Sequence, residues 1–357
     1  MSKPAKLTKL PVNLDYGSFA EEWAEASYAL GRLDESQKKL PNPFLLVAPM
    51  VTKEATISSK IEGTRSTLSD VMLFEAGEGA KYSDTLEVAN YRKATLWALG
   101  ALEKRNFNLS FIKELHSILL KGVRGEKLDP GSFRKDQVWI GKRGEDINQA
   151  TYVPVNPLHI LEYMENLESY LINDKSAPLI KTGVLHYQFE AIHPFKDGNG
   201  RIGRLIIPLY LYKNKMLYQP ILYLSGYFDA HRQKYIKSLH QVDLTNKYES
   251  WLRFFLKAVT AQAEETQKHI DQIMQLRSEI ENRTQNMKSP YCSKLLDFIF
   301  NMPVFSTSDI TKEMGFGRAT ALRLIKNLQE KGILQEHEDK ASKKKKIFLF
   351  LDFLKIL

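Results

Sequence analysis

The residues best suited to chemistry in this 357-residue chain lie in one segment, His193-Pro-Phe-Lys-Asp-Gly-Asn-Gly-Arg-Ile-Gly-Arg204. His193 can accept a proton from a hydroxyl group, because a neutral imidazole is a base near pH 7. Asp197 offers a carboxylate of the kind that Mg²⁺ uses together with substrate phosphates. Arg201 and Arg204 carry planar guanidinium groups that match phosphate oxygens. The segment therefore predicts a base, a metal ligand and an anion site within twelve residues.

Two predicted helices position this segment. Apolar residues over 180–192 predict a helix that ends at His193, since a following proline disfavours helical backbone in the residue before it. A second helix is expected from about Arg201. Gly198 and Gly200 can adopt conformations closed to other residues, and the free N–H groups of the second helix would attract an anion. A purely structural turn is the alternative, although such a turn rarely needs so many charged residues.

At every defining position the segment resembles the motif of the Fic family. The resemblance implies a mostly α-helical core that transfers AMP from ATP, with Mg²⁺, to a Ser, Thr or Tyr hydroxyl of a protein, itself included, and releases pyrophosphate. It implies that His193 is the catalytic base, that Asp197 holds Mg²⁺ and that Phe195 anchors the loop. The residues that it assigns to nucleotide binding are Gly198, Asn199, Gly200, Arg201, Ile202, Gly203 and Arg204.

Two further features are interpreted with the same family. Residues 137–140 and 151–153 alternate like strands around a turn, which predicts a hairpin. The part from Asp146 to Val155 resembles the flap with which the family holds its target segment. Tyr235 is expected to contact the nucleotide, or else to be an ordinary helix aromatic. Transfer of phosphocholine, UMP or phosphate would use the same loop, so the choice of AMP depends on the family's commonest activity.

A carboxylate near residue 62 suggests regulation. Apolar spacing predicts a helix over 51–61 that stops at Gly63, which leaves Glu62 at the end where the helix dipole disfavours an anion by roughly 0.3–1 kcal/mol. Either solvent or a cationic partner would explain it. Ser58-x-x-x-Glu62-Gly63 resembles the inhibitory motif of the Fic family. The resemblance implies that Glu62 reaches the nucleotide site, pairs with Arg204 and holds the enzyme inactive. Removal of AMP by the same site is a lesser alternative.

The last part of the chain has the element order of a winged helix-turn-helix domain. Helices are predicted around 295–299, after a capping box at Ser306 and Asp309, and over 318–331, with strands at 333–337 and 347–351. DNA binding would place Arg318, Arg323 and Lys326 on the reading helix and Lys343 to Lys346 on phosphates. A protein-contact module that forms a homodimer is the alternative. A DNA-binding regulator with a nucleotide-sensing Fic core is thus the second functional hypothesis.

Length and composition set the frame. The chain is longer than one core usually organises, so we predict four parts. They are an N-terminal helical region with the inhibitory helix (1–100), a Fic catalytic core (101–250), a connecting helix (251–288) and a winged helix (289–357). The 51 basic against 42 acidic residues favour nucleotides, nucleic acid or acidic partners. A single cysteine, Cys292, and the lack of a signal-like or membrane-spanning apolar run lead us to expect a cytoplasmic protein without membrane partners.

Overall fold

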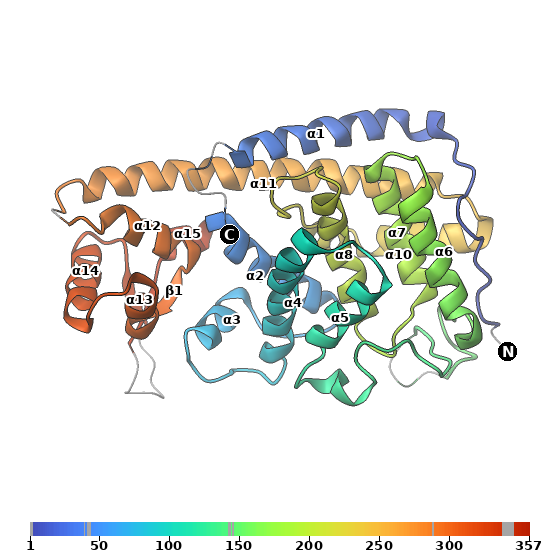
Figure 1. Ribbon diagram of the computed structural model, residues 1–357, viewed down its shortest axis with the longest axis horizontal. Helices are drawn as coiled ribbons and strands as arrows, with labels where there is room; N and C mark the ends of the chain where they lie inside the picture. The colour runs from blue at the N-terminus through green and yellow to red at the C-terminus, as the bar shows by residue number, and fades with distance from the viewer. Residues whose placement is uncertain are drawn as a thin grey trace. The chain divides into compact units, whose positions relative to one another are not determined.

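The chain is mostly helical, as expected, in the computed structural model (Figure 1). The structure describes residues 3–38, 40, 44–141, 144, 146–287, 289–337 and 346–357, with the side chains of 44–46 excepted. The α-helices are α1 (Ala20–Lys38), α2 (Phe44–Ile61), α3 (Leu68–Glu75), α4 (Thr85–Lys104), α5 (Leu109–Leu119), α6 (Ile160–Asn173), α7 (Pro178–Ile192), α8 (Asn199–Lys213), α9 (Ser225–Ala230), α10 (Arg232–Thr245), α11 (Glu249–Thr284), α12 (Cys292–Asn301), α13 (Thr307–Met314), α14 (Arg318–Glu330) and α15 (Leu351–Ile356). The strands are β1 (Val304–Ser306), β2 (Gln335–His337) and β3 (Ile347–Leu349).

The chain divides into two compact units, which are described separately. The core unit contains residues 1–31 and 93–263, and the C-terminal unit contains residues 32–92 and 264–357. Three helices, α1, α4 and α11, begin in one unit and end in the other. No helix of the described residues is long and apolar enough to cross a membrane.

Helix α7 is the centre of the core unit, where it packs against α6 and α8 (Figure 1). Its apolar residues are distributed around the whole helix, and a helix of this kind is stable only when it is covered on all sides. Gly183 lets α11 approach closely, because a Cβ atom there would lie 2.8 Å from a methyl group of Leu252. The indole of Trp251 donates a hydrogen bond to the carbonyl of Gly183 at 2.8 Å. These contacts fix the helix that ends at the predicted site.

The C-terminal unit combines an early and a late part of the chain. Helix α2 packs against α12, and α3 packs against β1 of an antiparallel sheet with the order β1-β3-β2. Met72, Ala76, Val304 and Ile347 form a shared apolar cluster. The helix that precedes Glu62 therefore belongs to the same compact unit as the predicted winged helix.

The predicted helices of the last domain are confirmed, and α13 begins with the expected capping box of Ser306 and Asp309. The two predicted strands also form, as β2 and β3. We did not predict β1, which has three residues, or α3. Residues 338–345, and so Lys343 to Lys345 of the predicted DNA contact, lie outside the described residues. Assignment of a winged-helix domain stays a prediction, as do the four domain boundaries.

Candidate active site

The predicted turn between two helices is present and has a constrained backbone. Helix α7 ends at Ile192, and His193 adopts a left-handed conformation (φ 50°, ψ 61°) while its N–H donates to the carbonyl of Phe189 at 3.0 Å. Such a conformation costs a residue other than glycine about 1–3 kcal/mol and persists only when its surroundings hold it. Gly198, with φ 79°, precedes α8, which begins at Asn199 rather than at Arg201.

Hydrogen bonds inside the turn leave little freedom to its backbone. The amide of Asn199 accepts from the N–H of Phe195 at 2.9 Å and donates to the carbonyl of the same residue at 2.8 Å. Phe195 is fully buried and so anchors the turn in the core. The carboxylate of Asp197 accepts from the N–H of Gly198 at 2.7 Å. Both ends of the Asn199 amide therefore hold the loop, and its role in phosphate binding stays a prediction.

A buried histidine that we did not predict supports the loop from α5. The ring of His116 stacks on Phe195 with centroids 3.7 Å apart and planes 7° apart. Its Nδ1 accepts from the N–H of Gly131 at 2.8 Å, so the neutral ring carries its proton on Nε2, which donates to the carbonyl of Asp197 at 2.8 Å. Burial lowers the pKa of His116 to about 4, which keeps the ring neutral at pH 7. His116 thus fixes Asp197 without adding charge.

Positive charge is concentrated at the start of α8. Arg201 and Arg204 are only 1% and 4% exposed, and they lie in the first two turns, at the positive end of the helix dipole. The guanidinium of Arg201 lies 3.7 Å from a carboxylate oxygen of Asp197. Gly203 lets α8 lie close to α7, because a Cβ atom there would collide with the carboxylate of Glu190. The start of α8 therefore suits a ligand with several negative charges.

The fit of Mg²⁺ depends on the single carboxylate of Asp197. This side chain is half-buried, and glycine at position 125 leaves room beside it, since a Cβ atom there would lie 3.1 Å from its second oxygen. No group of three His, Cys, Asp or Glu side chains among the described residues could form a complete metal cage. Asp197 therefore fits an ion that takes most of its ligands from water and phosphates, as Mg²⁺ does.

Tyr235 lies in the core of the same unit. Its hydroxyl is 2.8 Å from Nε2 of His186, and its ring stacks on Phe228 with centroids 4.4 Å apart. His186 is fully buried and donates through Nδ1 to the carbonyl of Gly203 at 2.7 Å. Tyr235 thus supports α8 through His186, as an aromatic residue of the helical core would. A contact of Tyr235 with the nucleotide stays a prediction.

Comparison with known proteins shows to which family the chain belongs. A model described as "Fic/DOC family N-terminal" matches residues 20–100, and one described as "Fic/DOC family" matches residues 106–211. Together they cover more than half of the chain. The chain belongs to the Fic/DOC family. The second match includes α7, the loop and the first turns of α8, so the predicted membership of the Fic family is confirmed.

Both sequences and solved structures of other Fic proteins are similar to this Fic protein. Protein adenylyltransferase fic-1 of Caenorhabditis briggsae is 25% identical over 225 residues, which are 62% of this chain and 40% of that protein. Protein adenylyltransferase Fic of Drosophila yakuba is 27% identical over 253 residues, 66% of this chain and 46% of that protein. The chain thus spans less than half of the length of these curated relatives. A Fic family protein of Desulfovibrio desulfuricans G20 has a TM-score of 0.58 at 22% identity, with 98% of each chain covered. Fic-1 of Caenorhabditis elegans has a TM-score of 0.55 at 20% identity, with 72% and 74% covered.

The hairpin that contains the predicted flap is held by one antiparallel bridge, between Ile140 and Tyr152. Ile140 and Tyr152 exchange two backbone hydrogen bonds of 2.8 and 3.1 Å. The hydroxyl of Tyr152 donates to the carbonyl of Ala191 at 2.9 Å, which ties the flap to the end of α7. Trp139 and Ile140 are 45% and 41% exposed, so the flap presents apolar side chains to solvent. Residues 142, 143 and 145, within the predicted turn, lie outside the described residues.

The predicted inhibitory motif lies at the end of α2 in the C-terminal unit. The helix ends at Ile61, as predicted, and Gly63 stops it with φ 95°. Ser58 is fully buried, whereas the side chain of Glu62 is exposed. Pairing of Glu62 with Arg204 and the inhibitory role of Ser58 stay predictions.

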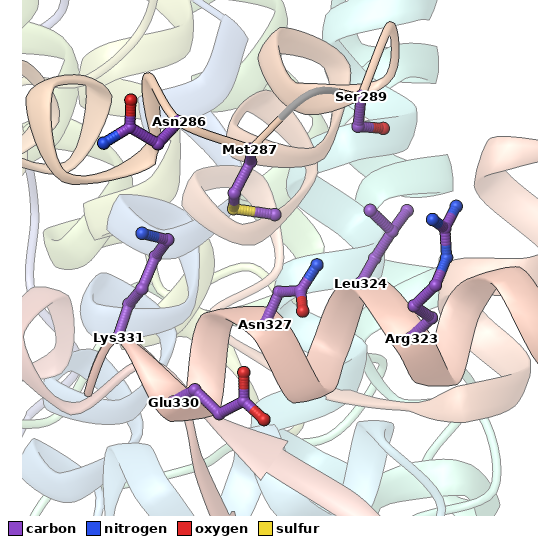
Figure 2. A pocket seen from close by; sticks show the side chains of 8 residues that line it. All are labelled: Asn286, Met287, Ser289, Arg323, Leu324, Asn327, Glu330 and Lys331. Atoms are coloured by element: carbon purple, nitrogen blue, oxygen red, sulfur yellow. The ribbon is translucent and has the colours of Figure 1, made fainter.

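The predicted DNA-reading helix is α14. Arg318, Arg323 and Lys326 are all exposed, and Lys326 lies 3.7 Å from the carboxylate of Glu330. Figure 2 shows that Arg323 and other α14 side chains face the segment that follows α11. Together they line an open pocket of about 500 Å³. Its lining residues are Asn286, Met287, Ser289, Arg323, Leu324, Asn327, Glu330 and Lys331. Contact with DNA stays a prediction for this helix.

Proposed function

We propose that this protein is an adenylyltransferase that moves AMP from ATP to a Ser, Thr or Tyr hydroxyl of a protein, its own chain included. The observation that carries the proposal is the loop between α7 and α8. It places a half-buried histidine with a constrained backbone just before a helix start that contains two buried arginines. The relatives named protein adenylyltransferases support the same reaction.

The reaction uses the loop residues in distinct roles. The oxygen of the target hydroxyl attacks the α-phosphorus of ATP, and its proton passes to the imidazole of His193. The bond between the α-phosphorus and the bridging oxygen breaks, and pyrophosphate leaves. Arg201, Arg204 and the first N–H groups of α8 stabilise the charge on the phosphates. Mg²⁺, when bound at Asp197 with the phosphates, would add charge neutralisation there.

A transfer assay with two labels tests this reaction. ATP labelled at the α-phosphate should leave label on the protein in the presence of Mg²⁺, whereas ATP labelled at the γ-phosphate should leave none. His193→Ala should remove the α-label. Label retained only from the γ-phosphate would show phosphate transfer and would refute the proposal, and labelled UTP or CDP-choline in parallel would reveal a different transferred group.

The proposal includes a brake formed by Glu62. Its support is the inhibitory motif and the stop of α2 at Gly63, which places Glu62 just beyond the helix. Pairing with Arg204 would keep this arginine from the outer phosphates and make ATP bind unproductively.

DNA binding is the second candidate function, and the exposed basic residues of α14 favour it. A regulator of this kind would use the Fic core to sense nucleotide. Its test is retention on duplex DNA at low salt, with affinity falling as salt rises. The absence of retention at low salt would leave only the protein-contact role.

A further inference from the structure

Arg134 is a buried arginine that lies between the catalytic loop and the flap and that the sequence did not single out. Arg134 is 2% exposed, although it lies close after the exposed Asp129. An arginine is rarely buried so completely unless its donors are all bound. The identity of those partners therefore indicates what Arg134 does.

The partners of Arg134 are backbone carbonyls from three segments. The side-chain Nε of Arg134 donates to the carbonyl of His193 at 2.8 Å. The backbone N–H of Arg134 donates to the carbonyl of Pro194 at 2.9 Å. One terminal nitrogen donates to Val155 of the flap at 2.6 Å and to Ile192 at 3.4 Å. The other donates to Asp136 at 2.9 Å.

Some of these carbonyls belong to the last turn of α7, where no N–H of the helix is left to bind them. The last carbonyls of any helix must find other donors. Here Tyr152 binds Ala191, and Arg134 binds Ile192, His193 and Pro194. We call these four carbonyls, of residues 191–194, the carbonyl run. Burial raises the pKa of Tyr152, so its hydroxyl stays protonated as a donor, and burial lowers the pKa of Arg134 only to about 10, so it stays charged at pH 7.

We propose that Arg134, with Tyr152, is a positioning residue that holds His193 in its left-handed conformation and sets the flap in fixed register with it. The inference rests on the proposed function, because the positioned group is the base of that reaction. One guanidinium reaches His193 and Val155 at once. The base and the segment that would hold the target are therefore fixed to each other through a single side chain.

The guanidinium shape is required for this role. Arginine offers five N–H donors in a planar fork, whereas lysine offers three donors at one point. Arg134→Lys keeps the charge but cannot reach carbonyls from three segments. A displacement of about 1 Å at a catalytic group can lower a rate about 10²-fold.

The test compares Arg134→Lys with Tyr152→Phe and with Arg253→Lys as a matched control. Arg253 also donates to a backbone carbonyl, that of Ser18, but it is exposed and lies on α11. With Glu62→Gly as the common background of all proteins, so that the proposed brake is absent, and at a temperature where all variants are folded, we expect Arg134→Lys to lower kcat about 10²-fold. The Kd for ATP, measured by calorimetry, should change less than about threefold, because the phosphate-binding residues keep their places. Tyr152→Phe, which removes one hydrogen bond, should lower kcat roughly fivefold, and Arg253→Lys should have no effect.

Hydrogen exchange gives a readout that does not need activity. The backbone N–H groups of the non-proline residues in 193–200 and 152–155 should exchange faster in Arg134→Lys and in Tyr152→Phe, but not in the control. Equal exchange in all variants would overturn the inference, even if the background protein transferred no AMP and the proposed function failed. An unchanged kcat in Arg134→Lys would also overturn it. If Arg134→Lys does not fold, Tyr152→Phe decides, because an unchanged kcat and unchanged exchange in that variant would exclude positioning through the carbonyl run.

Discussion

The start of α8 and the exposed face of α14 both concentrate positive charge, but they hold it differently. Arg201 and Arg204 of α8 are nearly inaccessible, whereas the side chain of Lys326 on α14 is 76% exposed. A buried guanidinium has lost its hydration and must be compensated by partners or by a ligand. An exposed lysine needs no compensation, so its presence alone says little. Burial of the charge, rather than its sign or number, is therefore what points to chemistry in this protein.

The largest expected effect comes from the loop before α8. His193→Ala should lower the rate of AMP transfer about 10²- to 10⁴-fold, because the target hydroxyl loses its base. Lys326→Ala on α14 is the matched exposed change and should leave the rate within twofold. Initial rates with labelled ATP measure both. Equal rates for the two variants would remove the distinction between the regions.

A second prediction concerns Glu62, the proposed brake. Glu62→Gly should raise automodification roughly tenfold or more, because a charge-assisted pair with Arg204 would be worth about 1.5–3 kcal/mol. Glu313→Gly, at an exposed carboxylate near the end of α13 in the same unit, is the control for a general loosening. If both variants or neither became more active, Glu62 would not be a specific brake.

A third prediction concerns His186, the buried histidine that binds the carbonyl of Gly203 on α8. Burial lowers the pKa of His186 to about 3, below its value of about 6.5 in the unfolded chain. Between these values the unfolded state binds the extra proton, so stability is complete above pH 6.5 and falls as pH decreases. The contribution of His186 to this loss should reach about 2 kcal/mol between pH 7 and pH 5. Urea unfolding at both pH values measures the total loss, to which His116 also contributes because burial lowers its pKa too. His186→Gln should reduce the total loss by about 2 kcal/mol, whereas the same change at the exposed His159 should not reduce it.

The smallest effect is expected on α14. Lys326→Ala should change the free energy of unfolding by at most about 0.5 kcal/mol, because its ion pair with Glu330 is exposed. If the helix reads DNA, the same change should lower the slope of log affinity against log salt by about 1. An unchanged slope in a protein that binds DNA would place the contact elsewhere.

The sequence was sufficient for features that depend on neighbouring residues. Proline after His193, glycine at 63 and the capping box at Ser306 each mark a helix boundary that the structure confirms. The predicted start of the helix after Gly198 is two residues too late. Local chemistry determines such boundaries, so a single sequence can reveal them.

Features that depend on distant residues were not predicted. Arg134 and His116 lie 59 and 81 residues from their partners His193 and Asp197. No local pattern links them to the loop. The strand β1 forms by pairing with β3, which is distant in the sequence. The long helices that pass through both units conceal where each unit ends.

The most direct test of the central claim is the intact mass of two proteins after incubation with ATP and Mg²⁺. One is Glu62→Gly, in which the proposed brake is absent, and the other is the same variant with His193→Ala. Our account predicts a mass gain of one or more AMP groups on the first protein and none on the second. Equal gains on both proteins, a gain equal to phosphate, or no gain on either would contradict it.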